Sequence, residues 1–379
     1  MPLDLHEMLT LAVQRHASDL HLKVGVPPVL RIDHALVPLE GQPRLVRADL
    51  DAIVALVTSE RQRQHFSERR ELDLAYGVQG LGRFRANLFQ QRGTLGITFR
   101  VIPLEVQTIE QLNLPPIIST LAMEPRGMVL VTGTAGSGKS TTLAAMIEHV
   151  NTNGSGHILT IEDPIEFLHK DRRCLINQRE VGVDTRSFAE ALRSALRQDP
   201  DVILVGEMRD FDTISTAIVA AETGHLVMST LHTIDAAETI NRIISIFPPY
   251  QQKQIRLQLA SVLRGIISMR LIPRADGEGR VPAVEVMVTT ATIRECITDP
   301  DKTRKLSEAI GAGGSEYGMQ TFDQSLMSLY QRGLVAYEEA LRWSSNPNDF
   351  ALKVRGIETA GDQPWPADRK GGLLGARRP

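Results

Sequence analysis

The sequence predicts an α/β protein in which a small α+β domain precedes a larger domain built on a parallel sheet. Within the first hundred residues, short stretches alternate between apolar and polar residues, as half-buried strands do. Further along, short runs that are apolar throughout alternate with helical patterns, which is typical of parallel strands joined by crossover helices. A glycine-rich stretch separates the first of these runs from a helix. At 379 residues, the chain is long enough for two or three domains.

The amino-terminal domain is predicted to span residues 1–102. Apolar residues at helical intervals predict a helix over residues 3–16, and a second helical segment is expected near residues 47–66. Alternating stretches predict five strands, with the sequences DLHLKV, VLRID, ELDLAYG, RFRANLFQ and LGITFRVI. A polar, proline-bounded stretch follows, and we therefore expect a linker over residues 103–115.

The second domain is predicted to span residues 116–357. Its strand candidates are four short apolar runs, MVLV, HILTIE, VILVG and LVMST, which suit a parallel sheet with crossover helices. A helix is expected over SFAEALRSALR, opened by a capping box of Ser187 and Glu190. After Phe247 the chain is expected to be mostly helical, and the composition of residues 358–379 predicts a disordered tail.

The composition disfavours several kinds of partner and site. The formal net charge is −3, so the chain offers no overall basic field for nucleic acid or for an anionic membrane. Cys174 and Cys296 lie far apart, which suggests neither a zinc site nor a disulfide framework and favours reduced thiols in the cytoplasm. The sequence shows no signal-peptide pattern and no apolar run long enough to span a membrane. Any membrane association is therefore expected to come through partners.

The stretch GTAGSGKST, residues 133–141, fits the pattern G-x-x-x-x-G-K-[ST] between a strand and a helix. Glycines let backbone N–H groups and the helix N-terminus converge on anionic oxygens. Lys139 is expected to reach the β- and γ-phosphates of a nucleotide, and Ser140 to join a Mg²⁺ ion that keeps most of its waters. The alternative is a glycine-rich turn that binds nothing. The predicted nucleotide-binding residues are Gly133, Thr134, Ala135, Gly136, Ser137, Gly138, Lys139, Ser140 and Thr141, the last of which supports the start of the helix.

Two acidic segments follow predicted strands. The first, TIEDPIEF, supplies Glu162, Asp163 and Glu166, and the second, DPDVILVGEMRD, supplies Glu207. Ligands of open parallel sheets bind beyond the carboxyl ends of the strands, so these acids are expected to face the phosphate loop. We assign Glu207 to Mg²⁺, partly through water, and one carboxylate of the first segment to the attacking water. The alternative makes all of them helix caps and surface charges.

Two histidines flank the predicted strand in TGHLVMSTLHT. Seven residues of extended chain span roughly 20 Å, so His225 and His232 cannot both touch one γ-phosphate. His232, at the carboxyl end, is the better candidate for sensing that phosphate. His225 is expected at a subunit boundary, and its alternative is a structural histidine.

The hairpin RFRANLFQQRGTLGITFR predicts an arginine cluster. If Arg92 and Gly93 turn the chain, Arg85 lies opposite Arg100, while Phe84 and Val101 pair on the buried face. Like charges directly opposite each other are destabilising unless an anion lies between them. Arg83, Arg85 and Arg100 are therefore candidates to bind phosphate, across a subunit contact as an arginine finger. The alternative is a solvated polar face.

Several long motifs carry a resemblance. SDLHL, TIEDPIEF, NQREVG, ALRSALRQDPDVILVGEMRD, AAETGHLVMSTLHT and GMQTFDQSL closely resemble the bacterial type IV pilus retraction ATPases of the PilT type, within the secretion superfamily ATPases. The resemblance runs from about residue 3 to residue 357. It implies a PAS-like amino-terminal domain and a RecA-like P-loop motor domain with carboxyl-terminal helices. It also implies a homo-hexameric cytoplasmic ATPase, peripheral at the inner membrane, that works with a pilus platform protein and a retraction ATPase paralogue.

The resemblance also implies roles for individual residues, motif by motif. Among the first acidic segment it points to Glu166 as the catalytic base, and it makes Glu207 the Walker B glutamate. Arg83, Arg85 and Arg100 fall where the family has phosphate-sensing arginines near the subunit junction. The remaining matches are Gly138, Lys139, Ser140 and Thr141 of the Walker A motif and His225 and His232 of the His box.

The sequence departs from the family in TTATIRECI, where retraction enzymes usually have Ala-Ile-Arg-Asn-Leu-Ile, although Arg294 is kept. This departure leaves an accessory retraction paralogue as an alternative. A pilus assembly or type II secretion ATPase is a separate alternative. The assembly and secretion enzymes typically carry a tetracysteine zinc module, which two isolated cysteines do not provide. A nucleotide-binding adaptor without catalysis and a DNA translocase are further alternatives, and the net charge disfavours the second.

Overall fold

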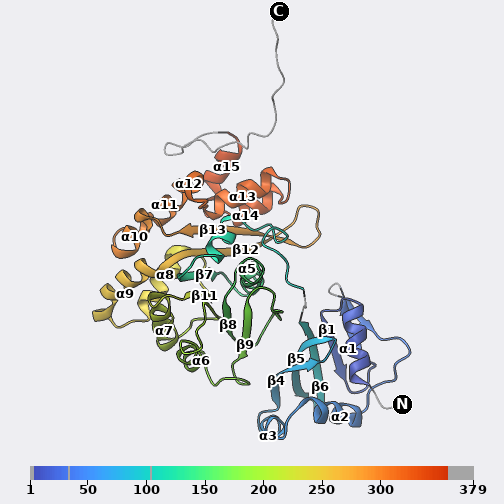
Figure 1. The fold of residues 1–379 in the computed structure, drawn as a ribbon. Coiled ribbons are helices and arrows are strands. Elements are labelled where there is room, and N and C mark those ends of the chain that lie inside the picture. The colour runs from blue at the N-terminus through green and yellow to red at the C-terminus, as the bar shows by residue number, and fades with distance from the viewer. Residues whose placement is uncertain (1–3, 33–34, 103–104, 357–379) are drawn as a thin grey trace, which may run out of the picture. The chain divides into compact units, whose positions relative to one another are not determined.

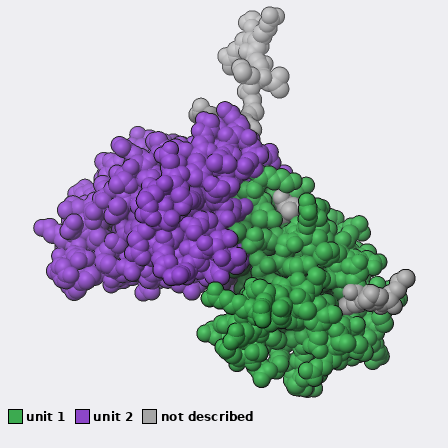
Figure 2. All heavy atoms as spheres, turned by 60° about the horizontal axis from the view of Figure 1, so that its bottom comes forward, with its two compact units in different colours: residues 1–106, 164–170 green, residues 107–163, 171–379 purple. Residues whose placement is uncertain are grey.

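The computed structural model describes residues 4–32, 35–102 and 105–356 (Figure 1). The chain forms two compact units (Figure 2). The first comprises the described residues up to Val106 together with Pro164–Lys170, and the second comprises Gln107–Asp163 and the described residues from Asp171 onward. The predicted disordered tail at 358–379 and residues 103–104 of the predicted linker lie outside the described residues.

The first unit is built on an antiparallel sheet with the strand order β3-β2-β1-β6-β5-β4. All five strands predicted for this region are present, and the short β3 was missed. The hairpin turn is confirmed, because Arg92 and Gly93 have φ values of 47° and 73° between β5 and β6. The strands are β1 (Asp19–Lys23), β2 (Val29–Ile32), β3 (Ala35–Pro38), β4 (Glu71–Val78), β5 (Gly82–Gln91) and β6 (Thr94–Ile102).

Three helices belong to this unit: α1 (Leu5–Gln14), α2 (Arg47–Val57) and α3 (Glu60–Arg69). The single helical segment expected near residues 47–66 is thus two helices. The chain is extended at Thr58 and Ser59, and Ser59 caps α3 by accepting the Gln62 N–H at 3.3 Å. One face of the sheet packs with the helices in a core that includes Leu9, Leu20, Leu50, Phe84 and Phe99. The other face carries the polar residues considered below.

The second unit contains a seven-stranded sheet with the order β13-β12-β7-β11-β10-β8-β9. All neighbouring pairs are parallel except β12 and β13. The predicted parallel sheet is confirmed, and its four predicted strands are β7, β8, β10 and β11. The strands are β7 (Gly127–Thr132), β8 (His157–Glu162), β9 (Leu175–Glu180), β10 (Val202–Val205), β11 (Leu226–Leu231), β12 (Leu263–Pro273) and β13 (Arg280–Val288).

Both faces of this sheet are covered. Along β7, Met128 and Leu130 join the core that includes α6 to α9, whereas Val129 and Val131 join the core that includes α4 and α5. This double burial explains why the parallel strands are apolar throughout. The helices are α4 (Ile117–Ala122), α5 (Lys139–Asn153), α6 (Phe188–Ala195), α7 (Phe211–Glu222), α8 (Ala236–Ser245) and α9 (Pro249–Val262).

The region after Phe247 is mostly helical, as expected, but the long hairpin of β12 and β13 was not predicted. Helix α9 ends at Val262 and β12 begins at Leu263, so no connecting segment separates the two elements, and Gly265 already lies within the strand. None of the helices in the described part of the chain is long and apolar enough to cross a membrane. The remaining helices are α10 (Ala291–Thr298), a 3-10 turn (Thr303–Lys305), α11 (Leu306–Ala312), α12 (Gly314–Tyr317), α13 (Phe322–Gln331), α14 (Tyr337–Trp343) and α15 (Pro347–Val354).

Candidate active site

The glycine-rich loop joins the carboxyl end of β7 to the start of α5. Its glycines are required by the backbone, because Gly133, Gly136 and Gly138 have φ values of 142°, 74° and 97°. A Cβ atom at Gly133 would lie 2.4 Å from the Ser137 Oγ and 2.6 Å from the Met269 carbonyl oxygen. The loop therefore folds back on itself closely enough that no other residue fits at this position.

Lys139 is the first residue of α5, and its side chain is buried under the loop. The Nζ atom donates hydrogen bonds to the carbonyl oxygens of Gly133 at 2.9 Å and Thr134 at 2.8 Å. Burial lowers the pKa of the Lys139 ammonium, and the negative charge of Glu207 opposes that shift. The ammonium is thus held against the loop by two carbonyl oxygens, which a phosphate oxygen can replace as hydrogen-bond acceptors.

The loop also offers donors for phosphate oxygens. The Ser137 Oγ atom is buried and has no hydrogen-bond partner within the described ranges. In the described part of the chain no side chain caps α5 at Gly138, so the helix begins there without a side-chain acceptor for its first N–H groups. Thr134, Ala135, Gly136 and Ser140 are exposed, and Thr141 is partly exposed. This orphaned hydroxyl, the glycine cradle and the helix N-terminus fit the phosphate chain of a nucleotide.

Glu207 and His232 lie together beyond the same edge of the sheet. Glu207 follows β10, His232 follows β11, and these two strands are parallel neighbours. The Glu207 Oε2 atom is 2.6 Å from the Nη2 atom of Arg209 and 3.8 Å from the Nε2 atom of His232. Since β11 also pairs in parallel with β7, the three strand ends bring these groups to the edge from which the phosphate loop starts.

A carboxylate and a hydroxyl at this edge fit the donor set of Mg²⁺, which prefers oxygen ligands. The Ser140 hydroxyl is exposed on the first turn of α5, and the Glu207 side chain keeps 19% of its surface accessible. When bound, the ion would neutralise charge on the phosphate oxygens. Arg209, which holds Glu207 in this structure, was not predicted, although it stands two residues after the acid in the sequence.

His225 lies at the opposite end of β11 from His232. Its Nδ1 atom is 2.9 Å from the Ala220 carbonyl oxygen and 3.4 Å from the Thr223 Oγ1, so the ring is held at the end of α7. Its own carbonyl oxygen accepts the Gly127 N–H at the start of β7. The two histidines thus stand at opposite edges of one sheet, and only His232 lies at the edge of the phosphate loop.

The first acidic segment divides between the two units. Glu162, the last residue of β8, accepts hydrogen bonds from Thr160 Oγ1 at 2.6 Å and Gln178 Nε2 at 3.2 Å. Asp163 is exposed and ends its stretch of the second unit. Glu166 lies in Pro164–Lys170, which belongs to the first unit. The order of residues along the chain gives no sign that this segment belongs to the first unit.

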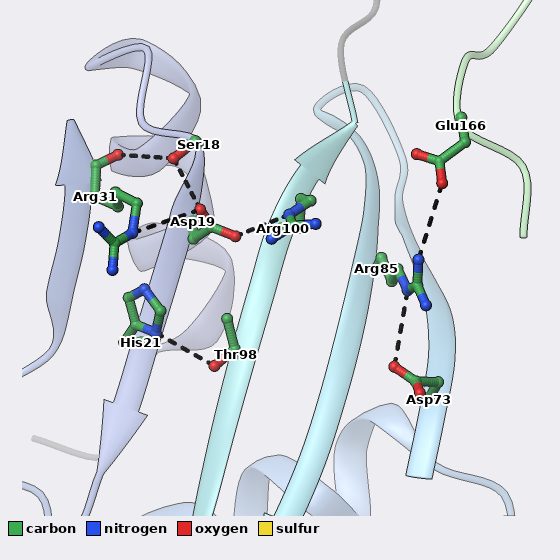
Figure 3. Close-up of polar contacts among 9 residues, drawn as sticks. All are labelled: Ser18, Asp19, His21, Arg31, Asp73, Arg85, Thr98, Arg100 and Glu166. Atoms are coloured by element: carbon green, nitrogen blue, oxygen red, sulfur yellow. Dashed lines mark hydrogen bonds and ion pairs between the residues drawn. The ribbon is translucent and has the colours of Figure 1, made fainter. Parts of the chain in front are cut away.

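The predicted arginine register is present in the first unit. Arg85 pairs with Arg100 and Phe84 pairs with Val101 across β5 and β6, and Arg83 lies two residues before Arg85 on the same face. Carboxylates of the protein lie beside both paired arginines (Figure 3). The Arg85 Nη1 atom is 3.9 Å from the Glu166 Oε1, and its Nε atom is 3.7 Å from the Asp73 Oδ1.

Arg100 has a different carboxylate partner. Its Nε atom donates to the Asp19 Oδ1 at 3.0 Å. Sequence reasoning missed both Asp19 and Asp73 as partners of the arginines. The signal for Asp19 was a charged residue at the start of a strand, but its partner depends on the pairing of β1 with β6, which are about eighty residues apart.

A buried strand, a glycine-cradled phosphate loop, the amino end of a helix and an acid after a neighbouring parallel strand together define a P-loop nucleoside triphosphate-binding protein. Residues 98–313 match the family model described as Type II/IV secretion system protein. The chain belongs to this family.

Two curated relatives come from Pseudomonas aeruginosa. The type IV pilus retractation ATPase PilT is 46% identical over 348 residues, which cover 92% of this chain and 100% of the relative. The type IV pilus ATPase PilU is 39% identical over 361 residues, 95% of this chain and 94% of the relative. A crystal structure of the pilus retraction motor PilT with bound ADP superposes with a TM-score of 0.84 at 46% identity, covering 92% of this chain and 98% of that chain. The chain is thus similar to ATPases of pilus machinery along nearly its whole length.

Proposed function

We propose that this protein is a Mg²⁺-dependent ATPase motor that couples ATP hydrolysis to the retraction of type IV pili in twitching motility. The observation that carries the proposal is the 46% identity to a pilus retraction ATPase across the full length of that relative. The phosphate loop also supports the proposal, because the buried Lys139 donates hydrogen bonds to two carbonyl oxygens of the loop.

In this proposal the chain comprises a PAS-like domain at residues 1–102, a linker at 103–115 and a RecA-like motor domain at 116–357. The protein works as a homo-hexamer in the cytoplasm and reaches the inner membrane through the pilus platform protein. An ATPase paralogue is a further proposed partner, and nucleic acid is not. Similarity to both PilT and PilU supports this setting.

The proposed chemistry assigns one task to each group. Residues 133–141 bind the phosphates of ATP, and Lys139 neutralises their charge. Ser140 and Glu207 hold Mg²⁺, partly through water. Glu166 accepts a proton from the attacking water. His232 detects the γ-phosphate beside Glu207, and His225 serves a subunit boundary.

The arginines of the first unit complete the proposed mechanism. Arg83, Arg85 and Arg100 of one subunit contact the phosphates of ATP bound at the loop of a neighbouring subunit. Their guanidinium groups favour a closed interface while the γ-phosphate is present, and its loss on hydrolysis opens that interface. Rigid-body rotation of the domains about the linker would then transmit force.

An accessory retraction ATPase is the second candidate, because TTATIRECI departs from the usual pattern of retraction enzymes and because a second pilus ATPase, PilU, is 39% identical over 95% of the chain. Surface pili counted by electron microscopy test both candidates in a strain that lacks the gene, in its parent and in a complemented strain. Excess pili that the complementing gene removes support the retraction motor. Cells without pili would move the function to assembly, and unchanged pili would favour the accessory role.

A further inference from the structure

Asp19 is a buried carboxylate in the middle of the polar face of the first unit's sheet. The residue is only 4% exposed, although Arg100, which lies beside it on the same face, is exposed. Asp19 is the direct cross-strand partner of Arg31 on β2 and of Arg100 on β6. Residues that oppose each other directly project from the same face, so the three side chains form a row across the sheet.

The carboxylate is bound on both oxygens (Figure 3). Its Oδ1 atom accepts the Arg100 Nε–H at 3.0 Å, and its Oδ2 atom accepts the Ser18 hydroxyl at 2.8 Å. The Arg31 Nε atom lies 4.0 Å from Oδ2. A buried carboxylate is costly unless it is paired and hydrogen-bonded, and these groups meet that requirement.

The contact uses only one edge of the Arg100 guanidinium. Asp19 binds the Nε–H, while 64% of the Arg100 side-chain surface remains exposed. A guanidinium has five N–H donors, so its two Nη groups remain as a planar fork of the kind that binds phosphate oxygens. The contact thus fixes where the arginine stands and leaves its phosphate-binding donors available.

Asp19 also acts against the repulsion between two neighbouring arginines. Arg85 lies directly opposite Arg100 on the next strand, and like charges in this position repel. Asp19 draws Arg100 toward β1, whereas Asp73 and Glu166 lie against Arg85. Without the Asp19 charge, Arg100 would lose the partner that sets its direction.

We propose that Asp19 is a positioning residue that holds Arg100 by its Nε atom so that the Nη groups can bind the γ-phosphate of ATP. This inference rests on the proposed role of Arg100. Asp19 does not itself bind nucleotide, because its carboxylate is buried and negative. A purely structural role is the competing explanation, in which the ion pair stabilises the sheet and has no effect on turnover.

A double-mutant cycle on the full-length protein separates these explanations. Asp19→Asn removes the charge at nearly unchanged shape and should lower kcat/KM for ATP by about tenfold, because a misplaced catalytic contact is costly. Arg100→Ala should lower kcat/KM by about a hundredfold. Since Asp19 acts through Arg100, the double variant should match Arg100→Ala rather than show the thousandfold loss expected for independent sites.

A matched control makes the same chemical change elsewhere in the unit. Asp51 pairs with Arg47 at 3.5 Å on the exposed surface of α2, so Asp51→Asn should leave kcat/KM unchanged. If Asp19→Asn does not fold, as judged by its thermal unfolding, Asp19→Glu takes its place in the cycle. That variant keeps the charge but shifts it, and it should lower kcat/KM at least threefold with Arg100 present and not at all with Arg100→Ala.

The outcomes distinguish this inference from the proposed function. One outcome is that Asp19→Asn has the wild-type kcat/KM and a lowered unfolding temperature, while Arg100→Ala has a reduced kcat/KM. That outcome overturns the positioning role alone. Wild-type kcat/KM in Arg100→Ala removes Arg100 from the mechanism and the inference with it. Losses that multiply in the double variant also overturn the positioning role, because Asp19 would then act independently of Arg100.

Discussion

Arg85 and Arg100 are direct cross-strand partners on β5 and β6, yet their guanidinium groups are paired with different carboxylates. The buried Asp19 binds Arg100, and the exposed Glu166 and Asp73 lie against Arg85. The protein thus supplies the anions that two opposed positive charges require. A phosphate group that approaches these arginines would compete with Glu166 for Arg85, and Glu166 is the proposed catalytic base.

Arg85→Gln should lower ATP turnover by at least about tenfold while changing the free energy of unfolding by less than about 1 kcal/mol. The stability change is small because the Arg85 contacts are long and partly exposed, and because the substitution also removes repulsion from Arg100. Steady-state hydrolysis and urea unfolding measure the two quantities. Arg47→Gln on α2, whose side chain is 79% exposed, is the control. Wild-type turnover in Arg85→Gln would exclude this arginine from the mechanism.

Glu166→Gln should keep ATP binding and lower turnover by about a hundredfold or more, since the amide cannot accept a proton from water. A fluorescent ATP analogue reports binding, and phosphate release reports turnover. Glu308→Gln makes the same change at an exposed position of α11 and should behave as the wild type. Unchanged turnover in Glu166→Gln would assign the base to another carboxylate, of which Glu162 and Asp163 are the nearest in sequence.

Gly133→Ala should weaken ATP binding by about a hundredfold, because its Cβ atom would meet a backbone carbonyl oxygen and the Ser137 hydroxyl. Gly136→Ala is a matched comparison in the same loop. Its φ of 74° is also positive, but a Cβ atom there has no neighbour within 4 Å among the residues that the structure describes, so we expect less than about a tenfold loss. Titration calorimetry with ATP measures both affinities, and equal losses would refute the steric explanation.

Glu285 predicts a pH dependence of stability within the second unit. Burial raises the pKa of its carboxyl to about 7, the hydrogen bond from the Ala236 N–H opposes the shift, and the charge of Asp235 adds to it. Its folded-state pKa lies above the unfolded value of 4.5, so the folded protein retains the extra proton between these values. The contribution of Glu285 to the free energy of unfolding therefore falls as the pH rises through that window.

Glu285→Gln removes this titration and keeps an oxygen that can accept the Ala236 N–H. The free energy of unfolding of Glu285→Gln, relative to that of the wild type, should rise by up to about 3 kcal/mol between about pH 5 and pH 8. Chemical unfolding of both proteins across this range measures the difference. A difference that is constant with pH would show that Glu285 is ionised in the folded protein throughout.

The parts of the fold that local sequence determines were predictable. The glycine spacing around Lys139 predicted the strand, loop and helix, and alternation in one hairpin predicted the pairing of Arg85 with Arg100. Apolar runs predicted the four central strands of the parallel sheet, because each is buried on both faces.

The parts that depend on distant segments were not predictable. The contact of Asp19 with Arg100 requires β1 to pair with β6, and nothing local to either strand indicates this pairing. Likewise, Pro164–Lys170 belongs to the first unit although its neighbours on both sides belong to the second. Strand β12 was missed because it continues directly from α9 with no connecting segment between them.

The central claim is that ATP held by this loop drives pilus retraction. The most direct test follows individual fluorescently labelled pili in cells whose only copy of the gene encodes the wild type or Lys139→Ala. The account predicts that pili retract with the wild-type protein and extend without retracting when Lys139 is replaced. Retraction at the wild-type rate with Lys139→Ala would contradict it.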